Sequence, residues 1–185
     1  MIDREARLLD AAIDVLATGG MRQLTHRAVD TAAGLPAGST SNRFRTREAL
    51  IVGVLRRILQ LETELWTTLA IDTRTPTIEA FAALIDRLLV EVTHGGHALT
   101  QARRAVFVDA ANQPALRREI ERAQEEIGSW LAPFLEELGS SAPSRDVQYL
   151  LALMDGLAGN QLVRPMPHFD PATAVAALLH GLIDG

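Results

Sequence analysis

Apolar residues recur every three or four positions along almost the whole chain, and this spacing constrains the fold more than any other feature. In the first segment Leu9, Ile13 and Leu16 fall on one stripe, the arrangement that buries one face of an α-helix. Alternation at period two, which marks β-strands, is rare. Because 48% of the 185 residues are hydrophobic, the chain can bury a core and disorder is excluded as its main state. An all-α fold is predicted.

Glycines, prolines and polar clusters divide the pattern into separate helices. The predicted helices cover about 3–18, 25–33, a short polar segment at 35–44, 46–69, 77–93, 98–111 and 115–138, with two more beginning at about 144 and 170. Four residues of types that favour N-caps precede apolar stretches: Thr25, Thr46, Ser144 and Asp170. We expect two domains, a head at residues 1–50 and a helical body at residues 51–185.

Several classes of protein are excluded by composition. The chain has no cysteine, which removes disulfides, thiolate metal sites and thiol nucleophiles. Charges interrupt every apolar stretch before the roughly 18 residues that a membrane helix needs, and the first residues lack the order of a signal peptide. A soluble cytoplasmic protein without a membrane partner is predicted.

The basic residues are concentrated near the N-terminus. The formal net charge is −5, but residues 22–57 hold seven arginines against Asp30 and Glu48, a local charge of +5 that leaves −10 for the rest. A basic patch on an acidic chain favours local contact with a polyanion.

Three short helices in the head meet around a tight turn at residues 34–36, as in a helix-turn-helix. The third helix carries small or hydrogen-bonding side chains, which suits entry into the major groove. Asn42 can pair with adenine and Arg43 with guanine, while serine and threonine serve bases or phosphates. The start of the second helix, at Thr25, can meet a phosphate with its exposed N–H groups.

At these residues the chain resembles the TetR family of transcriptional regulators over about residues 7–55. The matching positions are Leu8 to Ala12, Gly20-Met21, Leu24-Thr25, Arg27 to Val29, Ala32 to Leu35, Gly38 to Thr40, Phe44 and Thr46 to Leu50. The resemblance implies a homodimeric regulator, expected to be a repressor, that binds an inverted-repeat operator and is released when a small-molecule effector binds its C-terminal domain. It implies dimerisation through the last two long helices, at about residues 144–185.

The resemblance also assigns DNA contacts to individual residues. Those expected to face DNA are Thr25, His26, Arg27, Ala37, Gly38, Ser39, Thr40, Ser41, Asn42, Arg43, Arg45 and Arg47. Arg47 stands where the family usually has a phosphate-binding lysine. Ser41 stands where the family often has a tyrosine, and it is too short to reach a phosphate in the same way. The arginines must therefore supply the anchoring, which predicts a steep salt dependence.

Five residues of the body are candidates for binding the effector: Trp66, Phe107, Trp130, Phe134 and Asp155. Each aromatic ring could simply pack in the core, but together they could line a pocket. Asp155 interrupts an apolar run and is expected to be buried with a partner. That partner is Arg103, Arg104, a donor across a subunit interface, or the ligand itself.

No cofactor, metal or catalytic role is predicted. His94 and His97 lack a third ligand, and none of the common phosphate-loop, zinc-protease or nucleophile motifs is present. Two alternatives to a regulator remain. One is a helical protein that binds small molecules without recognising specific DNA, and the other is an enzyme using Asp155 with His168 or His180.

Overall fold

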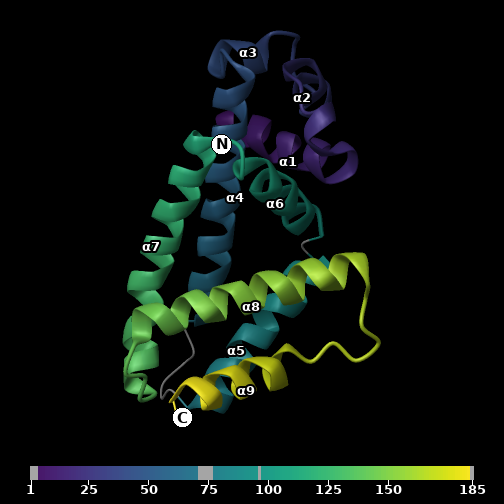
Figure 1. Cartoon of the computed structure of the whole chain (residues 1–185). Coiled ribbons are helices and arrows are strands. Elements are labelled where there is room, and N and C mark those ends of the chain that lie inside the picture. The colour runs from purple at the N-terminus through teal and green to yellow at the C-terminus, as the bar shows by residue number, and fades with distance from the viewer. Residues whose placement is uncertain (1–3, 71–76, 96, 184–185) are drawn as a thin grey trace. The chain divides into compact units, whose positions relative to one another are not determined.

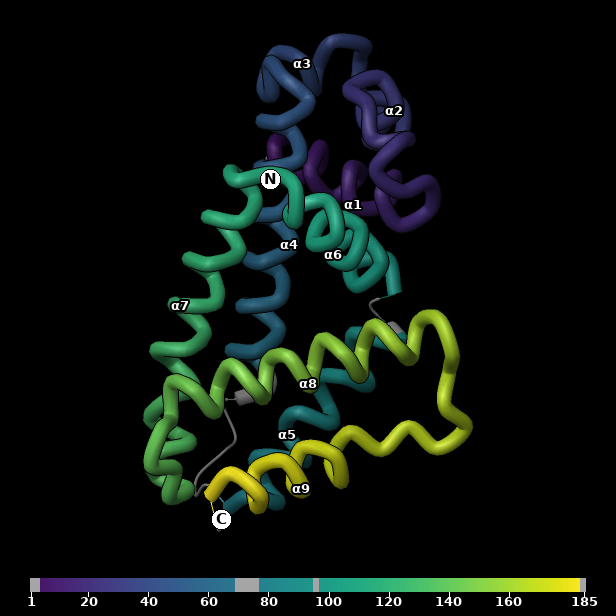
Figure 2. Tube along the Cα trace, viewed as in Figure 1, coloured from purple at the N-terminus to yellow at the C-terminus, as the bar shows by residue number. Residues whose placement is uncertain are grey.

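The computed structural model describes residues 4–70, 77–95 and 97–183, and within these ranges the chain is helical without a strand, as predicted (Figures 1 and 2). The predicted first residue, Asp3, and most of the predicted break before Thr77 lie outside the described residues. The helices are α1 (Arg4–Gln23), α2 (His26–Ala32), α3 (Ser39–Arg43), α4 (Arg47–Ala70), α5 (Ile78–Val90), the π-helix η1 (Glu91–Gly95), α6 (His97–Ala110), α7 (Pro114–Glu137), α8 (Pro143–Val163) and α9 (Pro171–Ile183).

The chain divides into two compact units. The first comprises residues 1–63 and 96–121, and the second comprises residues 64–95 and 122–185. The two units are defined by how residues pack within the chain, so they do not test where its functional domains divide. The predicted functional division between residues 50 and 51 stays a prediction.

The core of the first unit joins α1 to α2, α4 and α6. The stripe predicted on α1 is buried, with Leu16 at 2% exposure, and Val29 and Phe44 join the same cluster. Gly20 takes a left-handed conformation (φ 65°) and kinks the chain, but another helical turn follows to Gln23. The predicted break is thus confirmed at Gly20, and the helical segment extends further than residue 18.

The core of the second unit joins α5, α8 and α9 with residues of α4 and α7. Phe81 and Ile85 of α5 are fully buried and pack with Leu150 of α8 and Leu179 of α9. The buried residues of α8 follow a spacing of three and four, so this helix buries one stripe and exposes the rest.

Three of the four predicted N-caps are confirmed. The Thr25 hydroxyl accepts from the N–H of Ala28, the Thr46 hydroxyl from Ala49, and the Asp170 carboxylate from Thr173. Asp170 also accepts a bond from the Thr173 hydroxyl, and this bond first and the bond from the Thr173 N–H second lower the pKa of Asp170. Caps of this kind need only residues three positions apart, so the sequence reveals them.

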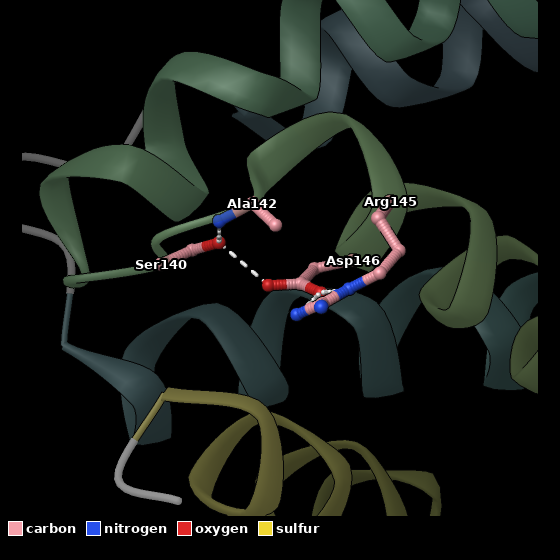
Figure 3. A network of polar contacts seen from close by, with 4 residues as sticks. All are labelled: Ser140, Ala142, Arg145 and Asp146. Carbon is pink, nitrogen blue, oxygen red and sulfur yellow. Dashed lines mark hydrogen bonds and ion pairs between the residues drawn. The ribbon is translucent and has the colours of Figure 1, made fainter.

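The fourth predicted cap, Ser144, is wrong, because α8 begins at Pro143 and the residue before it, Ala142, makes no side-chain cap. A buried network holds this end instead (Figure 3). The Ser140 hydroxyl donates to Asp146 over 2.6 Å and accepts from the N–H of Ala142, while Arg145 donates to the other carboxylate oxygen. Asp146 is 1% exposed, so the start of α8 is fixed by a carboxylate inside its own first turn.

Among the helices of the described ranges, none combines the length and the apolar character needed to span a bilayer.

Candidate functional sites

The helix α3 presents part of the predicted DNA-binding surface to solvent. Ser41, Asn42 and Arg43 are exposed on it, and Ala37 and Arg45 are exposed on either side. The Ser41 hydroxyl donates to the carbonyl of Gly38 at the start of the helix. The structure thus brings short polar and basic groups together on one small surface.

Two of the predicted contact residues on α3 lie inside the head. Thr40 is fully buried, and its hydroxyl donates to Asp30 over 2.6 Å. Ser39 is 8% exposed, and its hydroxyl donates to the Pro36 carbonyl and accepts from Arg4. Both hydroxyls therefore already serve the packing of α3.

The first turn of α1 lies against α3. Arg4 donates to Ser39 over 3.0 Å, and Glu5 forms an ion pair with Arg43. These residues surround a hollow of about 550 Å³. Its lining consists of Arg4, Glu5, Leu8, Ser39, Asn42 and Arg43. A carboxylate therefore holds one of the predicted DNA-binding arginines.

The start of α2 combines a cap with a tie to α3. Thr25 caps the helix, and Arg27 is exposed. The His26 ring lies 2.7 Å from the Phe44 carbonyl through Nε2. Because a carbonyl only accepts, His26 donates this bond, and it links α2 to the residue that ends α3.

Several arginines of the basic segment are paired within the first unit. Arg47 donates to the carbonyl of Met21 over 2.6 Å. Arg56 pairs with Glu119 and Arg57 with Asp10. The hydrogen bonds that Arg56 donates to Glu119 raise the pKa of Arg56, and the charge of Glu119 adds to the effect. The charge of +5 counted along the sequence thus exceeds the uncompensated charge of this surface.

Three of the four candidate effector-binding rings form a cluster in the second unit. The centroid of Trp130 lies 5.8 Å from Trp66 and 5.2 Å from Phe134, and Phe81 lies 6.4 Å from Phe134. Trp66 is buried, whereas Trp130 is 38% exposed. The cluster therefore has a buried base and an accessible edge, which is an arrangement that can stack a flat ligand.

Two of the predicted effector-binding residues are placed differently. Phe107 belongs to the first unit, where the Arg103 guanidinium lies 4.0 Å from its ring and also pairs with Glu62. Asp155 is exposed on α8 of the single chain, so it is not part of the core of its own subunit. The buried stripe of α8 runs through Leu150, Met154 and Ala158, and Asp155 lies off that stripe.

No group of three histidine or acidic side chains suited to a metal occurs in the described part of the chain. The His94 ring contacts the Val90 carbonyl of its own helical turn.

Comparison with known proteins identifies the family. Residues 76–185 match the family described as tetracyclin repressor-like, C-terminal domain. The chain belongs to the TetR family. Because this match covers the C-terminal part, it is independent of the head residues that suggested the same family. A search of curated proteins found no match.

Several solved structures share the fold over nearly the full chain. A transcriptional regulator from Rhodococcus sp. Rha1 has a TM-score of 0.84 at 23% identity, covering 99% of this chain and 97% of its own. A TetR-family member from Streptomyces coelicolor A3 has a TM-score of 0.75 at 25% identity, with 98% of each chain covered. The multidrug binding protein EbrR, complexed with ethidium, has a TM-score of 0.76 at 26% identity, covering 98% of this chain and 99% of its own.

Sequence reasoning missed Asp30, Arg4 and Glu5. Asp30 was counted only as a charge that opposes the basic patch, but it is 4% exposed and bonded to the start of α3. The signal in the sequence was an acidic residue four positions after His26, which places both side chains on the same face of α2. Arg4 and Glu5 contact residues 35 and 38 positions later, and no local pattern marks such pairs.

Proposed function

We propose that this TetR-family protein is a cytoplasmic repressor that binds an inverted-repeat operator as a homodimer and is released by a small-molecule effector. The observation that carries the proposal is the exposed face of α3, where Ser41, Asn42 and Arg43 lie together on a helix anchored from inside the head. Two such heads related by a two-fold axis match a palindromic site.

Exposed and buried residues of the head have different roles in the proposed DNA binding. Ser41 and Asn42 read base edges, while Arg43, Arg45 and Arg47 anchor the head on phosphates. The buried Ser39 and Thr40 set the position of α3. Arg43 must exchange its ion pair with Glu5 for a phosphate, and Arg47 its bond to the Met21 carbonyl.

The effector site proposed here is the cluster of Trp66, Trp130 and Phe134. Its accessible edge suits a flat aromatic compound, and an aromatic face attracts a cation. EbrR, to which this chain is similar, has been crystallised with ethidium, which is a flat aromatic cation. Binding would release DNA only to the extent that the effector prefers the arrangement that does not bind the operator.

The first test is a selection of bound sequences from random duplex DNA. One enriched inverted repeat is expected, and the selected operator then serves to test ethidium and similar cations for release. If the folded protein enriches no motif, the regulator proposal fails and a protein that binds small molecules without specific DNA recognition is favoured.

Dimerisation is assigned to α8 and α9. Gly156 of α8 is exposed, and a Cβ built there meets nothing within 4 Å. Tyr149 and Val163 of the same helix are 50% and 71% exposed. A small residue beside exposed apolar side chains allows two helices to approach closely.

Gly156→Arg should therefore raise the dimer dissociation constant by at least about tenfold, because the two-fold axis brings like charges together. Sedimentation velocity at several concentrations measures the change. Gly128→Arg is the matched control, since its Cβ also meets nothing within 4 Å and it lies on α7. If Gly156→Arg dimerises as tightly as the control, α8 is not the dimer interface.

A further inference from the structure

The start of α3 is held by one buried carboxylate of the preceding helix. Asp30 lies on α2 and is 4% exposed. Its Oδ2 accepts from the N–H of Gly38 over 2.8 Å, and its Oδ1 accepts from the N–H of Thr40 over 2.7 Å and from the Thr40 hydroxyl over 2.6 Å. Three donors at the start of α3 thus converge on one side chain.

The helix α3 has no other side-chain cap. Its N-cap residue is Gly38, which has a left-handed conformation (φ 91°) and offers no side chain. A helix of five residues is too short to be stable alone. Its position therefore depends on contacts from elsewhere in the head, and Asp30 supplies those at its first turn.

The other end of α3 is tied to the same helix. His26 precedes Asp30 by one turn of α2 and donates to the carbonyl of Phe44, which follows the last residue of α3. Residues four apart lie on the same helix face. One face of α2 thus holds both ends of α3. The two helices are neighbours in the head (Figure 1).

Asp30 is suited to this role as an ionised group. Burial raises its pKa, but the bonds from the Thr40 hydroxyl, the Thr40 N–H and the Gly38 N–H, together with the charge of His26, outweigh burial and leave the pKa below its ordinary value. Because the folded-state pKa is lowered, the stabilisation is present at neutral pH and is lost only as the pH falls through that lowered value.

We propose that Asp30 is the positioning residue for sequence reading, because it fixes the rotation and depth at which α3 presents Ser41 and Asn42 to the bases. This inference rests on the proposed operator binding. It also implies that the N–H groups of Gly38 and Thr40 are engaged internally, so phosphate anchoring falls to the arginines.

Asp30→Asn tests the proposal with almost no change in side-chain volume. The amide can accept at one oxygen only, and its NH₂ group then faces a donor of α3. Without DNA, hydrogen exchange at the Gly38 and Thr40 amides should quicken by at least about tenfold, since hydrogen bonds to a charged group are lost. Affinity for the selected operator should fall by at least about tenfold, whereas affinity for unrelated duplex DNA, which depends on phosphate contacts, should change little.

Matched variants distinguish the proposed positioning role of Asp30 from a general effect of its charge or of protein stability. Asp14→Asn removes the same charge from an exposed position of α1 and should leave both exchange and discrimination unchanged. Thr40→Val removes the hydroxyl that bonds Asp30, and it should reduce discrimination, while Thr40→Ser keeps the hydroxyl and should retain it.

The outcomes are distinct. Loss of affinity in equal proportion for the operator and unrelated DNA would overturn the proposal, because a lower folded fraction reduces both alike. Unchanged exchange at Gly38 and Thr40 would also overturn it. Quickened exchange in a protein whose wild type selects no operator would show the cap to be real but would overturn both the proposed function and the reading role.

Discussion

Raising the salt concentration from 50 to 200 mM should weaken operator binding by about a thousandfold. Arg43, Arg45 and Arg47 are exposed beside or on α3, and a dimer presents each of them twice. Six neutralised phosphates give a slope of about −5 in log K against log salt, because each contact releases condensed counterions. Fluorescence anisotropy with the selected operator at several salt concentrations measures this slope.

Two single variants identify the source of the slope. Arg47→Ala removes two phosphate contacts per dimer, so the loss of operator affinity over the same salt range should shrink to about 150-fold. The variant should also bind all DNA sequences more weakly. Asn42→Ala should leave the slope unchanged and reduce discrimination at one base position by about 1–3 kcal/mol. An equal loss at every operator variant for Asn42→Ala would remove its reading role. A wild-type slope near −1 would contradict the anchoring assigned to the arginines.

The helices and their local caps could be predicted from the sequence because their causes are local. The apolar stripe of α1 and the caps at Thr25 and Asp170 depend on residues within one or two turns. The cap at the start of α8 could not be predicted in the same way. Ser144 has the residue type of a cap, but Asp146 is buried and already binds Ser140, a fact that only packing reveals.

A candidate site could be predicted where its residues lie in one continuous segment. It could not be predicted where the packing of distant segments decides which side chains are exposed or come together. The exposed face of α3 follows from one short segment. The inward direction of Thr40 and the role of Asp30 require knowing how α2 packs on α3. Among the aromatic candidates, Trp66, Trp130 and Phe134 come together, while Phe107 packs in the other unit. Aromatic type alone gave no means of separating them.

Asp146→Ala should lower the free energy of unfolding by about 3 kcal/mol, because it removes hydrogen bonds to a charged acceptor and leaves the buried Ser140 hydroxyl without its partner. Asp146 is 1% exposed, Ser140 is 8% exposed, and the bond between them is 2.6 Å long (Figure 3). Water cannot readily replace the carboxylate there. Urea denaturation followed by circular dichroism measures the loss.

Arg145→Ala is the matched control for this network. Its side chain is 51% exposed although it pairs with the same carboxylate, so solvent screens the pair and its removal should cost less than about 1 kcal/mol. Asp146→Asn should fall between the two variants, since the amide oxygen still accepts from Ser140 but the amide no longer attracts Arg145. Equal destabilisation by Asp146→Ala and Arg145→Ala would mean that the ion pair, and not the buried bond to Ser140, holds the start of α8.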